Sequence, residues 1–149
     1  MPSKSPYIEL YRVMMLQIRR SVIRGGVVVN AKPVFLLALI NQIEDGMAVN
    51  NQFQYTKELA KAYKETWDKY IPNMSLTPLC KPFFYLTNDG FWHIQWKSKA
   101  SFSVPTDKRL RESVDYGYFD NALWDLLQDE SHREYYRRVI IDFFLNQNE

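Results

Sequence analysis

The pattern of apolar and polar residues is most distinctive over residues 30–46, where every position from 34 to 40 is apolar. An apolar run with no polar face is typical of a helix that is buried on all sides. Asn30 is expected to cap this helix with its side chain, and Pro33 suits the first turn, where its missing amide costs nothing. Gly46 is expected to end the helix. We therefore predict a buried central helix, whose apolar run is too short to cross a bilayer.

Apolar residues at roughly helical spacing predict further helices on both sides of this one. The first is expected to cover residues 6–24 and to end at Gly25-Gly26, with residues 27–29 as an extended link. The next is expected to begin at a Thr56 cap and to run to about Tyr70.

The C-terminal third also carries signals for helix starts. Thr106 is expected to begin a short basic helix, and Asp120 can cap the following one. Ser131 and Glu134 have capping-box spacing, so each can satisfy an exposed amide of the other. A final amphipathic helix is therefore predicted after Ser131.

Between these helices the period of the pattern changes. Residues 82–86 are predicted to form a short strand, Asn88-Asp89-Gly90 a tight turn, and residues 91–97 the partner strand. The predicted fold class is therefore mainly α (α+β). We expect a single compact helical domain over residues 1–149, built around the buried central helix with one β-hairpin.

Composition narrows the function classes only slightly. The chain has 149 residues, of which 46% are hydrophobic and 15% aromatic, enough for a core within one domain. The net charge of +2 does not by itself indicate a nucleic-acid partner. Cys80 is the only cysteine, so no internal disulfide can form, and the N-terminus resembles no secretory signal. We expect a cytoplasmic protein with no membrane partner, and the oligomeric state stays open.

The residues that usually carry catalysis or bind metal are sparse. His93 and His132 are the only histidines, and neither has a cysteine or second histidine at a ligand spacing, so we expect no metal and no cofactor. Asp89 and His93 form a conceivable acid–base pair, but a turn aspartate beside a strand histidine is the favoured interpretation. We predict no catalytic residue and no catalytic activity in this chain.

Basic residues are more informative, because they alternate with aromatic residues between positions 81 and 111. The cluster comprises Lys81, Lys97, Lys99, Lys108, Arg109 and Arg111. Cations beside exposed aromatics can neutralise phosphates and contact bases. A solvated face over a hairpin whose aromatics belong to the core is equally compatible with this spacing. Lys32, near the positive end of the central helix, is a separate candidate for binding an anion.

Two segments carry a resemblance to a known family. Ala31-Lys32-Pro33-Val34-Phe35-Leu36-Leu37 and Pro82-Phe83-Phe84-Tyr85-Leu86-Thr87-Asn88-Asp89-Gly90-Phe91-Trp92 resemble the N-terminal DNA-binding domain of McrA-type HNH restriction endonucleases. That family includes sulfur-binding domains that recognise phosphorothioated DNA. Its members place a basic residue and a proline before a Leu-rich buried helix, and follow a Tyr-Pro-Phe segment with an Asp-Gly-aromatic-Trp motif. The order and spacing agree over most of this chain.

The resemblance implies a DNA-recognition module of the type IV, modification-dependent kind. Lys32 matches the basic residue before the helix, and Pro82 matches the proline that forms one wall of the sulfur pocket. Ala31 stands where the family often has His, and Lys81 stands where it has Tyr. A lysine suits a phosphate oxygen, whereas an aromatic wall suits a poorly hydrated sulfur. Whether sulfur recognition survives, and whether the DNA target is modified, is therefore left open.

We accordingly expect a genome-defence domain that contacts the DNA backbone through a basic surface beside an aromatic β-hairpin. The residues expected to bind DNA are Lys32, Lys81, Pro82, Tyr85, Lys108, Arg109 and Arg111. No nuclease domain is expected within residues 1–149, so the partners would be double-stranded DNA and a separate nuclease subunit. The alternative is a protein-interaction or structural subunit of a defence complex that does not bind DNA directly. A hydrolase that uses Asp89 and His93 is the third and weakest hypothesis.

Overall fold

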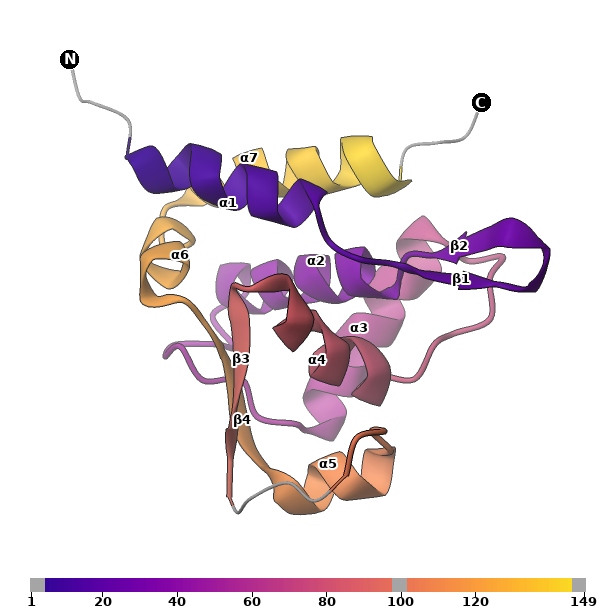
Figure 1. Ribbon diagram of the computed structural model, residues 1–149. Helices are drawn as coiled ribbons and strands as arrows, with labels where there is room; N and C mark the ends of the chain where they lie inside the picture. The colour runs from indigo at the N-terminus through magenta and orange to yellow at the C-terminus, as the bar shows by residue number, and fades with distance from the viewer. Residues whose placement is uncertain (1–4, 98–101, 146–149) are drawn as a thin grey trace.

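The computed structural model describes residues 5–97 and 102–145, and it confirms a mainly helical α+β fold (Figure 1). Its helices are α1 (Pro6–Leu16), α2 (Ala31–Glu44), α3 (Lys57–Tyr70), α4 (Cys80–Tyr85), α5 (Asp107–Ser113), α6 (Asn121–Leu126) and α7 (Glu130–Ile140). Short helical turns are η1 (Arg24–Gly26), η2 (Leu86–Asp89) and the π-helical η3 (Ile141–Leu145). The strands are β1 (Ser21–Ile23), β2 (Val27–Val29), β3 (Trp92–Trp96) and β4 (Val114–Phe119).

Helix α2 is the buried centre of the molecule, as its apolar run predicts. Residues 33–40 are all buried, with α1 and α7 on one side of the helix and α3 on the other (Figure 1). The centroid of the Phe35 ring lies 5.5 Å from that of Trp92, in an edge-on contact. It lies 5.8 Å from the centroid of Phe83, whose ring is tilted against it. Aromatic residues of α2, α4 and β3 thus form one core, which anchors α4 against the start of the central helix.

Two of the expected helix caps are formed. The Thr56 hydroxyl accepts a hydrogen bond of 3.1 Å from the Leu59 amide at the start of α3. The Thr106 hydroxyl accepts one of 3.1 Å from the Arg109 amide at the start of α5. Both bonds satisfy amides of a first turn that have no partner within the helix.

Three other caps were predicted wrongly because their side chains have other partners. Asn30 precedes α2 but does not cap it: its oxygen accepts from Arg20 and its amide donates to the Phe144 carbonyl. Asp129, not Ser131, caps α7, and it accepts from both the amide and the hydroxyl of Ser131.

Asp120 occupies the predicted position before α6, but its carboxylate does not cap the helix. One oxygen accepts a hydrogen bond of 2.8 Å from the Tyr11 hydroxyl, and the other lies 2.5 Å from Nε2 of His93. The carboxylate therefore joins α1 to β3 across the end of the molecule. Because both carboxylate oxygens have partners outside α6, neither accepts a hydrogen bond from the first turn of that helix.

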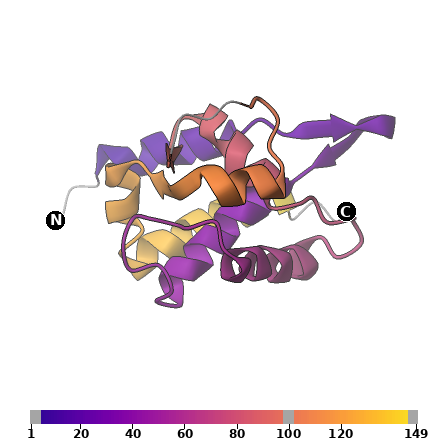
Figure 2. The same cartoon turned by 90° about the horizontal axis from the view of Figure 1, so that it is seen from below.

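The first helix is shorter than predicted, and a hairpin takes its place. α1 ends at Leu16, and β1 pairs antiparallel with β2. Gly25 and Gly26 form the turn with φ values of +87° and +78°, which only glycine adopts without strain. The two glycines therefore reverse the chain between two β-branched strands. This hairpin extends beyond the helices in both views (Figures 1 and 2).

The hairpin predicted over residues 82–97 is wrong in its first half. Residues 82–86 belong to α4 and η2, and β3 pairs with the distant β4, with Trp92 opposite Phe119. Gly90, at φ +96°, ends η2 instead of forming a hairpin turn. A short apolar run of five residues fits a buried helical turn as well as a strand, and only the tertiary partner decides. No helix in the described part of the chain is long and apolar enough to cross a membrane.

Candidate nucleic-acid interface

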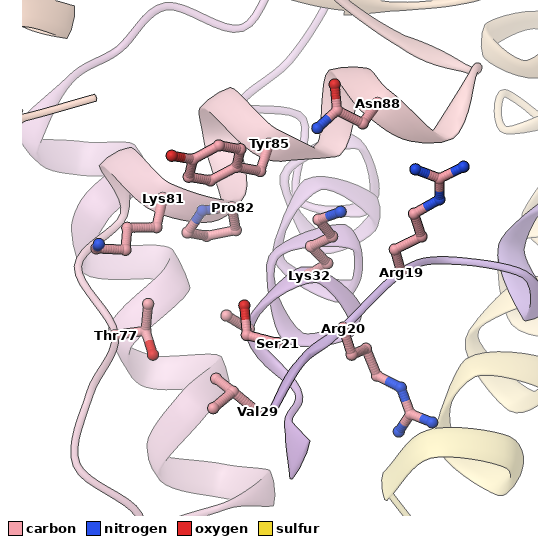
Figure 3. Close-up of a pocket in the computed structure, with 11 residues that line it drawn as sticks. Arg19, Arg20, Ser21, Val29, Lys32, Thr77, Lys81, Pro82, Tyr85 and Asn88 are labelled. Atoms are coloured by element: carbon pink, nitrogen blue, oxygen red, sulfur yellow. The ribbon is translucent and has the colours of Figure 1, made fainter. Parts of the chain in front are cut away.

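A pocket of about 420 Å³ opens where the segment after α1, the end of the β1–β2 hairpin, the start of α2 and α4 meet (Figure 3). Four basic residues line it: Arg19, Arg20, Lys32 and Lys81. Its apolar and aromatic lining comes from Val29, Ala31, Pro82 and Tyr85. Residues as far apart in the sequence as Arg19 and Asn88 thus border one cavity. We call this cavity the basic pocket.

The structure divides the predicted DNA-binding residues into two groups. Lys32, Lys81, Pro82 and Tyr85 all line the basic pocket. Lys108, Arg109 and Arg111 lie instead on α5, below α3 and α4 in Figure 1. Lys97 follows β3, where its amide donates to the Ser113 carbonyl at the end of α5, and Lys99 lies outside the described residues.

The basic residues of α5 are partly occupied by local contacts. The Arg111 guanidinium forms an ion pair of 2.7 Å with Asp107, and the pKa of that carboxyl is lowered by this hydrogen bond and by another from Tyr55. Arg109 donates to the Val104 carbonyl at 2.6 Å. Lys108 is exposed on the same helix. α5 therefore offers a second basic surface that is distinct from the basic pocket.

Lys32 is held at the wall of the basic pocket by a buried ion pair. Its Nζ lies 2.7 Å from Oδ2 of Asp89, and the two side chains are 12% and 3% exposed. The other oxygen of Asp89 accepts a hydrogen bond of 3.0 Å from the backbone amide of Arg19. Asp89 therefore fixes both Lys32 and the segment that enters β1.

Arg20 contributes its stem to the pocket but directs its charge elsewhere. Its guanidinium donates to Asn30 at 2.8 Å and lies 4.8 Å from the centre of the Phe144 ring. Figure 3 shows this group pointing away from Lys81 and Tyr85. Arg20 consequently packs the end of the chain against the start of α2.

Arg19 and Lys81 are the exposed cations of the pocket. Within residues 5–97 and 102–145, neither of their charged groups lies within ion-pair distance of a carboxylate. Their positive charge is therefore available to an anionic ligand. Beside them, the buried Pro82 and Ala31 present apolar surface. An anion with one poorly hydrated side fits this combination of charge and apolar wall.

Arg19 and Asn88 line the basic pocket, but the sequence analysis did not identify them as candidates. Arg19 was assigned to a continuous first helix, whereas it lies in the segment between α1 and β1. The Gly25-Gly26 pair, with Val22-Ile23 before Arg24 on one side and three valines on the other, was the signal for a hairpin that would have placed it correctly. Asn88 was assigned to a hairpin turn and lies in η2, at the edge of the pocket.

The weakest hypothesis, an acid–base pair of Asp89 and His93, does not fit the geometry. Asp89 bonds to Lys32 and Arg19, whereas His93 pairs with Asp120. His93 and Asp120 line a separate cavity of about 270 Å³. Among the described residues, no group of three or more His, Cys, Asp or Glu side chains could hold a metal ion.

Comparison with known proteins places the fold. No family model matches the chain, and no curated protein matches its sequence. The fold is similar to that of a solved structure described as the Type IV phosphorothioation-dependent restriction endonuclease ScoMcrA, with a TM-score of 0.69 and 14% sequence identity. The match covers 99% of this chain but only 31% of that chain. The resemblance to an McrA-type domain is thus confirmed at the level of the fold.

Proposed function

We propose that this chain is a DNA-recognition domain of the modification-dependent restriction type, which holds the backbone of a duplex in the basic pocket. The observation that carries the proposal is the meeting of Arg19, Lys32, Lys81 and Pro82 around one cavity. The fold similarity to part of a phosphorothioation-dependent endonuclease supports the same function. Cations from three separate segments around one opening are well suited to a phosphate group.

The lining favours a backbone group over a base as the occupant. Arg19 and Lys81 supply positive charge that can replace the counterions of a phosphate. Pro82 and Ala31 supply an apolar wall, which suits a sulfur atom that is poorly hydrated. Phosphodiester and phosphorothioate groups share the negative charge and differ in this one atom. The pocket is therefore proposed to bind either group, with Lys81 favouring oxygen and Pro82 favouring sulfur.

The remaining predicted residues form a second proposed contact. Lys108, Arg109 and Arg111 on α5 are proposed to meet a phosphate away from the pocket. All three residues are exposed, but Arg109 donates to the Val104 carbonyl and Arg111 pairs with Asp107, so part of their charge is engaged locally. The contribution of Lys108 to binding should therefore exceed that of Arg111.

Cleavage is proposed to depend on a nuclease outside this domain. This chain corresponds to 31% of the endonuclease that shares its fold. The recognition domain would then direct a separate nuclease subunit to its site. Mixing the chain with candidate nucleases and a bound duplex, and measuring strand cleavage, tests this step.

Duplex binding against salt concentration tests the proposal directly. Labelled plain, methylated and phosphorothioated duplexes are titrated with the wild-type chain and with Lys81→Gln, Arg19→Gln and Lys61→Gln. Lys61 is exposed on α3 and does not line the pocket, so it controls for the loss of one surface charge. Each lost phosphate contact should reduce the slope of log affinity against log salt by about 0.9. Equal slopes for all four proteins, or no duplex binding near 100 mM salt, would refute the proposal.

A second candidate function is a protein-interaction subunit of a defence complex. It is favoured by apolar side chains that α1 leaves exposed at i, i+3 and i+6: Tyr7, Leu10 and Val13. Such a stripe suits a partner helix. Light scattering of the pure chain, with Leu10→Ser as the variant, separates this function from DNA binding. An oligomer that dissociates in Leu10→Ser, without any duplex binding, would favour it.

A further inference from the structure

The β1–β2 hairpin exposes an apolar surface that the core does not use. Val22, Ile23, Val27 and Val28 are 65%, 51%, 43% and 36% exposed. The hairpin projects from the helical body in both views (Figures 1 and 2). A two-stranded ribbon without a packed face gains little stability on its own. Four exposed β-branched residues on such a ribbon therefore point to a partner.

The register of the hairpin shows which face continues the basic pocket. Ser21 is opposite Val29, and Ile23 is opposite Val27, so these four residues share one face. Ser21 and Val29 line the basic pocket. Ile23 and Val27 consequently extend the wall of the pocket outward. Val22 and Val28, which are also opposite each other, form the other face.

The dimensions of the hairpin match a groove of DNA. Each strand has three residues, which span about 10 Å at a rise of about 3.3 Å per residue. The major groove of a B-form duplex is about 12 Å wide and about 8.5 Å deep, and it admits a two-stranded ribbon. A backbone group bound in the pocket at the base of the hairpin would lie at the edge of that groove. The tip would then reach the base edges.

The exposed basic residues lie where the phosphates would be if the hairpin entered the groove. Arg19 lies two residues before the start of β1, and Lys81 lies across the pocket, so both exposed cations are at the base of the hairpin. The strands themselves carry no charged residue. At the tip, Gly25 and Gly26 have open space around their Cα atoms, so the backbone there can approach base edges closely. The two exposed cations of the pocket thus face the region of the phosphates and the apolar strands face the bases, with one basic residue, Arg24, in the turn at the tip.

We infer that the β1–β2 hairpin enters the major groove and lays Ile23 and Val27 against thymine methyl groups of the duplex. This inference rests on the proposed function, because the basic pocket must hold the adjacent backbone. Apolar side chains distinguish thymine in the major groove through its C5-methyl group. The hairpin would therefore add sequence preference to the contact that the pocket makes with the backbone.

The test compares the two faces of the hairpin. Ile23→Thr/Val27→Thr changes the pocket-side face, and Val22→Thr/Val28→Thr changes the opposite face by similar chemistry. Threonine is β-branched, so both pairs keep the strand preference of the hairpin. The probe is a pool of 20-base-pair duplexes of random sequence, in the backbone form that binds wild type more tightly. We expect the first pair to weaken binding about tenfold and the second pair to change it less than twofold.

A second measurement changes the DNA instead of the protein. The same pool is made with deoxyuridine in place of thymidine, which removes every C5-methyl group. Wild type should bind the uracil pool about tenfold more weakly, whereas Ile23→Thr/Val27→Thr should discriminate less between the two pools, because each threonine keeps only one methyl group. Equal wild-type affinity for the two pools would overturn the inference even if the double variant failed to fold.

The outcomes separate this inference from the proposed function. If Lys81→Gln weakens binding and reduces the salt slope while both hairpin pairs match wild type, the pocket binds DNA and the hairpin inference is wrong. If no duplex binds, the proposed function itself fails. If light scattering shows a wild-type dimer that Ile23→Thr/Val27→Thr dissociates, the hairpin contacts a second copy, and the inference is overturned.

Discussion

Lys32 and Asp89 form an ion pair of 2.7 Å that joins the first turn of α2 to the last residue of η2. Both side chains are largely buried, and Asp89 also binds the Arg19 amide. The pair therefore holds three segments of the basic pocket in place. It also compensates the charge of Lys32, so the residue that matches the family's basic residue before the buried helix is not a free cation.

The compensated charge predicts unequal roles for the two lysines of the pocket. Lys81→Gln should reduce the log–log salt slope of duplex binding by about 0.9, because a free cation is lost. Lys32→Gln should reduce the slope by less than half of that, because its charge is already paired with Asp89. Fluorescence anisotropy titrations between 50 and 200 mM salt would measure both slopes. Equal reductions would show that Lys32 leaves Asp89 when DNA binds.

Removing Asp89 should destabilise the fold. Asp89→Ala leaves the largely buried ammonium of Lys32 unpaired, and breaking a buried pair in this way typically costs about 3–5 kcal/mol. Because the Lys32 side chain is 12% exposed, we expect a loss of about 3 kcal/mol in the free energy of unfolding. Urea denaturation followed by tryptophan fluorescence would measure it.

An exposed ion pair provides the control for this measurement. Lys64 and Asp68 are 2.8 Å apart on α3, with side chains 61% and 55% exposed. Asp68→Ala should change the free energy of unfolding by no more than about 0.5 kcal/mol, because water screens exposed pairs. Similar losses for both variants would mean that burial of the Lys32–Asp89 pair does not increase its contribution to stability.

Local signals in the sequence predicted the elements whose partners are close in the chain. The apolar run of α2 and the Thr56 cap of α3 follow from helix physics alone, and both are confirmed. Residues 82–86 carried no such signal, because five apolar residues suit a strand or a helical turn equally. Their conformation is decided by packing against Phe35 and Trp92, which contact Phe83. The pairing of β3 with β4 is equally non-local.

The sequence predicted those residues of the candidate site that belong to local motifs, but not those placed there by distant contacts. Lys32 and Pro82 were identified through their motifs, and both line the basic pocket. Arg19 was hidden inside a helix that was predicted to be eight residues too long (24 − 16). Asp89 was expected in a turn, and no sequence pattern indicates that its partner lies at position 32. Ion pairs between distant segments depend on the tertiary fold.

The close packing of β3 against β4 predicts that Gly117 tolerates no side chain. A Cβ atom at this position would overlap the Trp92 ring and approach the Phe83 ring to 3.1 Å. Gly117→Ala should therefore lower the free energy of unfolding by about 3 kcal/mol, since neither buried ring can move freely. Urea denaturation would measure the loss.

Gly46→Ala is the control for Gly117→Ala, because it introduces backbone strain without steric overlap. Gly46 has a φ of +76° and open space around it, so an added methyl group meets no neighbour. The strain of that conformation should cost about 1–2 kcal/mol. A loss for Gly117→Ala that is no larger than this would show that the Trp92 ring can shift to make room.

Buried tyrosines predict a loss of stability at alkaline pH. Burial raises the pKa of Tyr63 above its ordinary value near 10, and its hydroxyl donates to the Thr77 carbonyl at 2.7 Å. Above pH 10 the unfolded chain releases this proton and the native chain keeps it. The contribution of Tyr63 to the free energy of unfolding should therefore be constant below pH 10. Above pH 10 it should fall by up to about 1.4 kcal/mol per pH unit.

Tyr63→Phe isolates this contribution. The variant should be less stable than wild type by about 1 kcal/mol at pH 8, because it lacks the hydrogen bond to Thr77. Its free energy of unfolding should then fall less steeply between pH 10 and pH 11, because one titrating group has been removed. The two curves should approach each other as the pH rises. Parallel curves across this range would mean that native Tyr63 ionises as readily as the unfolded residue, and that the Thr77 contact does not hold the hydroxyl proton.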